Sequence, residues 1–455
     1  MKRIHIVAAC VAAMLMMPGF RPVGFVPGDL SPAIVWSAEN DGMNALAERY
    51  VKLVLALGQH DADYVDAFYG PPEWRKEAER SKRPLAAIDA DAAGILKQLA
   101  AAAPPSSADE PTMLRHQYLT KQLQALRTRV AMLGGKKLTF DEEAKALYDA
   151  VPPVHTEAEF EKTLEQLEKR LPGDGRLIDR YDAFRKRFVI PKERLDAVFR
   201  AAIDGCRQRT IRHVELPETE SFVVEYVTGK SWSGYNWYQG NYRSIIQVNT
   251  DLPIYIDRAV VLACHEGYPG HHVYNVLLEK HLVRDRGWVE FSVYPLFSPQ
   301  SLIAEGTANF GIDVAFPHAD RLAFERDVLF PKAGLDPKLV DEYYDVFALT
   351  ERLSYAGNEA ARRYLNGTID KSTAADWLER YALYTKPRAE QRVRFIEQYR
   401  SYVINYNLGK DMVAAYVNGR AGKDPEKRWA EFERLLSSPR LPSGLTAATP
   451  GKPEA

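Results

Sequence analysis

One stretch of this chain reads His265-Glu266-Gly267-Tyr268-Pro269-Gly270-His271-His272, and it contains three of the ten histidines in the sequence. Apolar runs lie on both sides of it, at residues 259–264 and 273–278. The pattern predicts imidazoles and a carboxylate inside a buried helix. Because a buried ionisable group is costly unless it is paired or coordinates a metal, the stretch indicates a metal site around which the fold is built.

The spacing of the histidines requires a break in that helix. In the motif His-Glu-x-x-His two zinc ligands four residues apart share one face, but here Pro269 stands four residues after His265. His271 and His272 would lie about 9 Å and about 10.5 Å further along an unbroken helix, whereas zinc holds each nitrogen at about 2.1 Å. Proline interrupts a helix and glycine permits a tight bend. We therefore interpret the stretch as a zinc helix with Pro269-Gly270 inserted before its second histidine.

The ligand set follows from this interpretation. His265 is the first ligand and His271 the second, while His272 is either the alternative second ligand or a residue that hydrogen-bonds substrate. A catalytic zinc site needs a third protein ligand and one open position. Residues 301–310 have a helical pattern in which one acid, Glu305, stands among small and apolar residues. We expect Glu305 to be the third ligand.

Two further polar residues fit roles beside such a site. Asn309 follows Glu305 by four residues on the same helix face, where it could orient a ligating histidine. Glu266 directly follows His265, as expected of a general base that takes a proton from the water that zinc acidifies. The chemistry predicted from these residues is zinc-assisted hydrolysis of an amide.

The motif and the acid-bearing helix together resemble a known family. His-Glu-x-x-Pro-Gly-His-His followed by a Glu-Gly helix is similar to the bacterial "domain of unknown function 885" family, a group of zinc peptidases akin to gluzincins. Residues 352–360, with Tyr364 and Gly367, resemble that family's Tyr-x-x-x-Pro-Gly-Gln-Ala…Tyr-x-x-Gly stretch, except at Ala356 and Asn358. The resemblance covers roughly the second half of the chain. It implies a mainly helical zinc hydrolase and no particular substrate.

A hydrolytic site also needs a hydrogen-bond donor for the tetrahedral oxyanion. The resemblance of residues 352–360 to the family motif makes Tyr355 the first candidate for this catalytic role. Tyr364, Arg352 and His272 are the alternatives.

Patterning divides the chain into four parts. Residues 1–38 are predicted to be a signal peptide, because Lys2 and Arg3 precede an apolar run at residues 6–17. An N-terminal helical region (residues 39–216), a zinc-hydrolase catalytic region (217–437) and a disordered tail (438–455) follow. No other stretch looks transmembrane, so we expect no integral span after signal removal and a periplasmic or secreted location. Export would permit a Cys206–Cys264 bridge; an inert buried thiol at Cys264 is the alternative.

The periodicity predicts a mainly α fold. Helical spacing runs from residue 42 to about residue 212, including residues 61–69, whereas residues 220–228, 232–237 and 242–248 alternate like strands. We expect a large helical, gluzincin-like fold with a small antiparallel sheet next to the zinc helix. By analogy with gluzincins, residues 242–248 would form an edge strand that pairs with extended substrate; a structural hairpin is the alternative.

Charge and composition narrow the partners. Lysines and arginines (60) nearly cancel aspartates and glutamates (61), which argues against nucleic acid or an anionic membrane as the main partner. Two hypotheses remain. One is an exported zinc metallopeptidase that acts on a peptide substrate. The other is a non-catalytic peptide-binding protein on a degenerate metallopeptidase fold, which has no need of an acid at Glu266.

Overall fold

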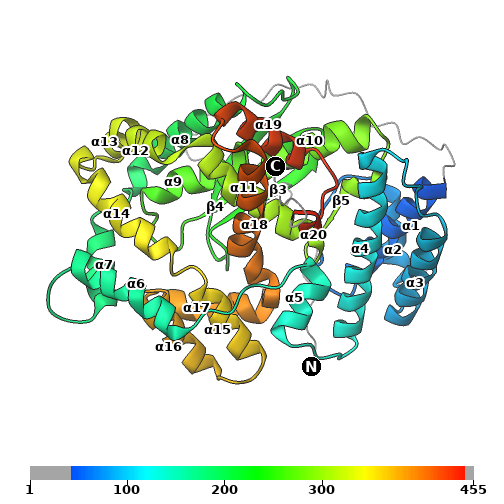
Figure 1. The fold of residues 1–455 in the computed structure, drawn as a ribbon, viewed down its shortest axis with the longest axis horizontal. Helices are drawn as coiled ribbons and strands as arrows, with labels where there is room; N and C mark the ends of the chain where they lie inside the picture. Colours follow the sequence, from blue (N-terminus) through cyan, green and yellow to red (C-terminus); the bar gives the residue numbers. More distant parts are fainter. Residues whose placement is uncertain (1–41, 446–455) are drawn as a thin grey trace, which may run out of the picture.

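The computed structural model describes residues 42–445, so the predicted signal peptide and residues 446–455 lie outside the described residues. Helices dominate this part of the chain, which confirms the mainly α class, and two small sheets accompany them (Figure 1). Among the described residues, none of the helices combines the length and apolarity that crossing a bilayer demands.

The N-terminal region consists mainly of helices whose starts carry clear capping signals. Thr139 and Glu142 form a capping box at α5, and Thr156 and Glu159 form another at α6. In Figure 1 the blue and cyan helices α1 to α4 form one side of the molecule. The helices of this region are α1 (Gly42–Leu57), α2 (Pro72–Ser81), α3 (Leu85–Ala101), α4 (Glu110–Leu133), α5 (Phe140–Tyr148), α6 (Glu157–Arg170), α7 (Leu177–Lys186) and α8 (Leu195–Thr210).

One segment of this region is a strand where a helix was expected. Within residues 61–69, Val65–Phe68 forms β1, which pairs antiparallel with β5 (Val293–Pro295). The helical prediction was wrong because the partner strand lies far away in sequence and local periodicity carries no record of it. The pairing joins the N-terminal region to the second half of the chain.

The second sheet has three strands in the order β2-β4-β3, namely β2 (Ser221–Val227), β3 (Gly234–Gly240) and β4 (Arg243–Asn249). β3 and β4 pair antiparallel, as predicted, whereas β2 runs parallel to β4. β4 is therefore the central strand, with both edges already hydrogen-bonded. The expectation that residues 242–248 form a free edge for substrate was wrong.

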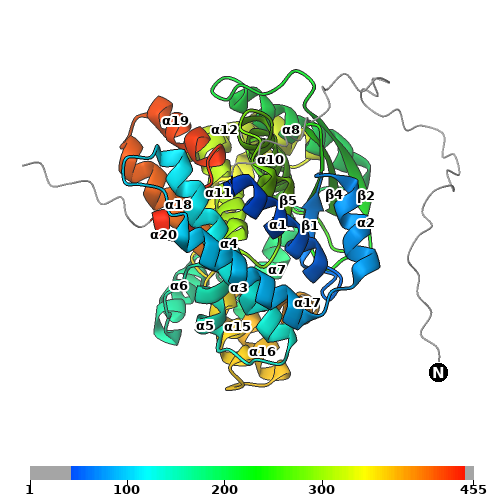
Figure 2. The ribbon, with the colours of Figure 1, turned by 90° about the vertical axis from the view of Figure 1, so that its right-hand side faces the viewer.

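The central helices hold the motif. α9 (Asp257–Leu262) continues into a π-helical turn, η2 (Ala263–Gly267), and after a break the chain resumes as α10 (His271–Leu278). α11 (Pro299–Ala315) packs along α18 (Ile404–Ala421) in the middle of the molecule (Figures 1 and 2). A Cβ at Gly306 would lie 2.5 Å from the carbonyl carbon of Gly409, so the two helices approach backbone to backbone.

The remaining helices complete the core, which extends from Leu46 to Leu445 as one cluster of buried side chains. Residues 438–445 are not part of a disordered tail as predicted, since Leu441 and Leu445 are buried and a short helix forms there. The C-terminal helices are α12 (His318–Phe324), α13 (Phe330–Ala333), α14 (Val340–Glu351), α15 (Ala356–Leu365), α16 (Lys371–Tyr381), α17 (Lys386–Tyr399), α19 (Pro425–Leu436) and α20 (Pro442–Leu445).

A disulfide joins Cys206 on α8 to Cys264 in η2. It fixes the turn that carries the first motif histidine against the N-terminal region. Of the two alternatives drawn from the sequence, the structure has the bridge.

Candidate metal centre

Three of the expected ligands converge. His265 Nε2 lies 3.2 Å from His271 Nε2 and 3.2 Å from Glu305 Oε2, and His271 Nε2 lies 3.7 Å from the same oxygen. Ligand atoms around a tetrahedral zinc ion with bonds of about 2.1 Å are about 3.4 Å apart. The three distances therefore match the spacing that one such ion requires.

The chain brings the two histidines together through the break that the sequence predicts. The Tyr268–Pro269 peptide bond is cis, and the Gly270 N–H donates to the carbonyl of Cys264 at 2.9 Å. A Cβ at Gly270 would stand 1.9 Å from the His265 carbonyl oxygen, so glycine is needed for this return of the chain. α10 then starts at His271, on the same side as His265.

Residues outside the triad fix the first imidazole. Asn309 Nδ2 donates to the carbonyl of Tyr406 at 3.1 Å, which leaves Asn309 Oδ1 to accept from His265 Nδ1 at 3.1 Å. With its proton on Nδ1, His265 presents the lone pair of Nε2 to the centre. The expected role of Asn309 is consistent with this geometry.

The carboxylate of Glu305 is held in a similar way. The Tyr402 hydroxyl donates to Oε1 at 2.7 Å, whereas the buried Oε2 facing the imidazoles has no hydrogen bond of acceptable geometry. Burial would raise the pKa of Glu305, but His265 and His271 hold it well below its usual range. A buried carboxylate oxygen that lacks a donor is costly, and a cation at this position removes that cost.

The donor set fits zinc. Two imidazole nitrogens and one carboxylate oxygen are a common ligand set of catalytic zinc sites. Burial alone would lower the pKa of His271, but Glu305 raises it to about 9. The described residues contain no other comparable group of three histidine, cysteine or acidic side chains.

Glu266 lies beside the triad with a free carboxylate. Its backbone carbonyl accepts from Asn236 Nδ2 at 2.8 Å, and among residues 42–445 its side chain makes no hydrogen bond. A Cβ at Gly234 would come within 2.7 Å of Glu266 Oε1, so a side chain at the start of β3 would displace this carboxylate. Burial raises the pKa of Glu266, and His265 and His271 oppose that shift.

His272 does not face the triad. Its Nε2 lies 2.9 Å from Glu220 Oε2 and its Nδ1 lies 2.9 Å from Ser244 Oγ. The side chain is 0% exposed. The expectation that His272 binds substrate or ligates the metal is corrected, because both ring nitrogens are occupied and no substrate can reach them.

The candidate oxyanion donors also have other partners. The Tyr355 hydroxyl donates to Asp411 at 2.6 Å, Tyr364 bonds Glu397 and Arg352 bonds Gln166. None of these contacts reaches the triad, so the catalytic role expected of Tyr355 is corrected as well. The cause is the packing of α15, which follows from tertiary contacts that the motif resemblance does not encode.

One acid near the triad was missed. Asp66 on β1 accepts from the Tyr235 hydroxyl at 3.0 Å. Burial raises the pKa of Asp66 to about 7 against the effects of Tyr235 and His271. The available signal was the short apolar run ending at a Gly-Pro-Pro turn, which is typical of a strand.

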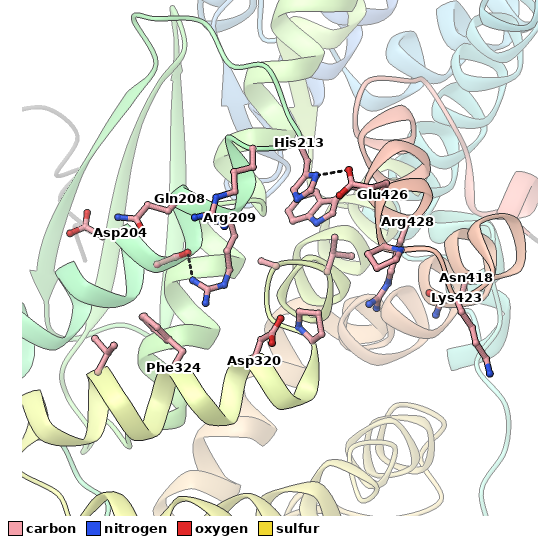
Figure 3. Close-up of a pocket in the computed structure, with 18 of the residues that line it drawn as sticks. Asp204, Gln208, Arg209, His213, Asp320, Phe324, Asn418, Lys423, Glu426 and Arg428 are labelled. Atoms are coloured by element: carbon pink, nitrogen blue, oxygen red, sulfur yellow. Dashed lines mark hydrogen bonds and ion pairs between the residues drawn. The ribbon is translucent and has the colours of Figure 1, made fainter.

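A separate hollow of about 1030 Å³ lies between α8, α12 and the α18–α19 turn. Figure 3 shows Arg209 and Arg428 entering it from opposite sides, with Asp320 below them. His213 stacks on Trp429 at 4.8 Å and pairs with Glu426. None of its lining residues belongs to the triad.

No protein-family model matches the sequence, and no curated protein matches it. Solved structures resemble the fold only remotely. A protein from Colwellia psychrerythraea described as a lipoprotein is 14% identical, with 78% of this chain and 68% of that chain covered and a TM-score of 0.47. A protein from Shewanella oneidensis described as a lipoprotein of unknown function is 13% identical (82% and 75% covered, TM-score 0.44). An M32 carboxypeptidase from Deinococcus radiodurans R1 is 16% identical (86% and 87% covered, TM-score 0.35). Similarity at this level indicates neither a shared activity nor a shared substrate.

Proposed function

We propose that this chain is an exported zinc metallopeptidase that hydrolyses peptide bonds. The observation that carries the proposal is the convergence of His265, His271 and Glu305, with an unsatisfied carboxylate oxygen between two imidazole nitrogens. The resemblance of the motif to the "domain of unknown function 885" peptidases and the predicted signal peptide support the same reading.

The three ligands would hold the ion, and zinc bound there supplies an acidified water and a polarised substrate carbonyl. Glu266 is placed to accept the proton of that water, because its carboxylate is free and its helix carries His265. It then passes the proton to the leaving amine.

Tyr406 replaces Tyr355 as the candidate donor to the oxyanion. Its side chain is affected electrostatically by Glu305 and Glu266, and burial raises the pKa of its phenol well above the usual value. The phenol therefore stays protonated and able to donate. Its backbone carbonyl already anchors Asn309, which places the residue close to the triad.

The test compares the parent protein with Glu266→Gln, each loaded with zinc, on a peptide library read by mass spectrometry. We expect cleavage by the parent, and for Glu266→Gln a loss of turnover of about 10²- to 10⁴-fold with zinc retained. His265→Ala and Glu305→Ala should each lose zinc. A parent protein that binds zinc and peptides but cleaves none would instead support the non-catalytic binding protein.

A further inference from the structure

We propose that the site recognises the free C-terminal carboxylate of its peptide through Arg258, Arg388 and Arg392, and releases short C-terminal fragments. This inference rests on the proposed function, since it assigns a substrate class to the same site.

Arg258 lies on the same helix face as Glu266, the proposed general base. Arg258, Leu262 and Glu266 follow one another at four-residue spacing. A Cβ at Gly234 would meet both Leu262 Cδ2 and Glu266 Oε1 at 2.7 Å. The neighbouring Ser233 accepts a hydrogen bond from Arg258 Nη2 at 3.0 Å. One stretch of chain therefore lies along Arg258 and Glu266, which are separated by at most about 12 Å of helix axis.

Arg388 and Arg392 come from the first turns of α17. The Arg388 guanidinium lies over the ring of Tyr384 at 4.3 Å, and that of Arg392 lies 5.8 Å from the ring of Tyr406. Tyr406 holds Asn309, which in turn holds His265. Arg392 is thereby connected to the triad through Tyr406 and Asn309.

These guanidinium groups lack carboxylate partners. Within residues 42–445, none of the three forms an ion pair, and the buried Nε of Arg392 has no acceptor. Asp257 is close to Arg258, but its carboxylate accepts from the Tyr343 hydroxyl instead. Arg258 and Arg388 are half-buried and donate to the uncharged Ser233 and Tyr384, whereas a buried donor without an acceptor, such as Arg392 Nε, is costly. The arrangement is complementary to an anionic group that the chain itself does not supply.

The arginines also influence one another and the phenol between them. Burial lowers the pKa of Arg258 and Arg388 lowers it further, whereas Asp257 and Glu266 oppose the shift. Burial would raise the pKa of Tyr384, yet Arg388 and Arg392 bring it below its ordinary value. Arg388 and Arg392 therefore place positive charge beside Tyr384 that no ion pair neutralises among the described residues. A carboxylate suits these groups because a guanidinium binds it through two parallel hydrogen bonds.

The distance between Arg258 and Glu266 along the helix limits the size of the released fragment. An extended peptide advances about 3.3–3.6 Å per residue, so about 12 Å of axis corresponds to about three residues at most. A terminal carboxylate bound at the arginines would place a bond one to about three residues from that end beside Glu266.

Binding provides a test that is independent of turnover. Zinc-loaded Glu266→Gln is titrated by calorimetry with one hexapeptide as the free acid, as the C-terminal amide and as the N-acetylated free acid. We expect the amide to bind about 10- to 150-fold more weakly than the free acid, as for loss of a charge-assisted hydrogen bond, and N-acetylation to change little.

Arginine variants in the same background locate the effect. Arg258→Gln and Arg388→Gln should each reduce the difference between acid and amide, and Arg258→Lys should preserve part of it. Arg428→Gln removes another arginine without an ion pair, in the hollow of Figure 3, and should leave the difference unchanged.

Three results would overturn the proposal: equal affinity for acid and amide, no measurable binding of the free acid, or weakening by N-acetylation alone, which would point to Asp66 and an amino terminus.

Products made by the zinc-loaded parent give a second readout. Internal cleavage alone contradicts terminal recognition but leaves the peptidase proposal intact. Failure to cleave any peptide contradicts the peptidase proposal, while the binding measurements still decide carboxylate recognition.

Discussion

Two adjacent histidines in this molecule have opposite surroundings. His271 faces His265 and Glu305, where one buried carboxylate oxygen lacks a hydrogen bond. His272 lies between Glu220 and Ser244, and both of its ring nitrogens have partners. The first cluster (His271, His265 and Glu305) and the second cluster (His272, Glu220 and Ser244) contain similar chemical groups, and their histidines are adjacent in sequence.

The comparison teaches that residue type does not separate a site from a structural contact. What separates them is whether the polar atoms are satisfied and whether the group can be reached. The His271 side chain is 12% exposed and that of His272 is 0% exposed. The first cluster contains a buried carboxylate oxygen without a hydrogen bond, whereas the second joins α10 to β4 with both ring nitrogens of His272 paired.

The sharpest way to break this comparison is to remove each histidine in turn. His271→Ala should lower the zinc content from near one ion per chain to near none, because it deletes a ligand. His272→Ala should keep its zinc and instead lose about 1–3 kcal/mol of unfolding free energy, since it leaves buried partners unpaired. Mass spectrometry of the metal and denaturant titration measure the two effects. Zinc loss in His272→Ala alone would reverse our assignment.

Low pH should reduce the stability that the second cluster (His272, Glu220 and Ser244) contributes, because Glu220 becomes protonated. Burial would raise the pKa of Glu220, but His272, Tyr268 and Arg207 lower it to about 2. A lowered carboxyl pKa contributes stability that is complete above the ordinary pKa of 4.5 and is lost as the pH falls toward 2. The contribution is about 3 kcal/mol.

Unfolding titrations between pH 6 and about pH 2 check this expectation. Glu220→Gln should remove this part of the acid dependence, and the exposed Glu218→Gln should not. Parallel pH profiles for the parent protein and Glu220→Gln would contradict the assignment.

The first cluster (His265, His271 and Glu305) can also be tested through Asn309, which contacts His265 but is not a proposed ligand. Asn309→Ala removes the acceptor that orients His265, and loss of such a partner typically weakens metal affinity about 10- to 100-fold. Competition with a zinc chelator gives the affinity. The exposed Asn418→Ala is the matched control, and equal affinities in the two variants would remove Asn309 from the centre.

The smallest expected effect belongs to Ser244. Ser244→Ala deletes one hydrogen bond to His272, so it should cost about 1 kcal/mol of stability and leave zinc affinity as it was. Thermal unfolding with and without zinc measures both quantities. A change in zinc affinity of tenfold or more would show that the two clusters are coupled.

The sequence predicted the features that depend on local chemistry. Pro269 and Gly270 break the helix through their own backbone chemistry, whatever the helix packs against. Glu305 could be recognised because it is a single acid among small and apolar residues. The mainly helical class likewise follows from periodicity along the chain.

Features that depend on tertiary placement were not accessible in this way. β1 becomes a strand only through pairing with β5, more than two hundred residues later. The sequence therefore did not predict that Asp66 lies near the triad. Tyr355 was assigned through motif resemblance, yet the packing of α15 turns its hydroxyl to Asp411. Which of His271 and His272 faces the centre depends on the orientation of α10 after the break, and spacing alone leaves both open.

A crystal of the zinc-loaded protein, with an anomalous difference map at the zinc edge, tests the central claim most directly. We predict one peak at about 2.0–2.2 Å from each of His265 Nε2, His271 Nε2 and Glu305 Oε2. No peak there, or a zinc ion held by a set of side chains that includes His272, would contradict it.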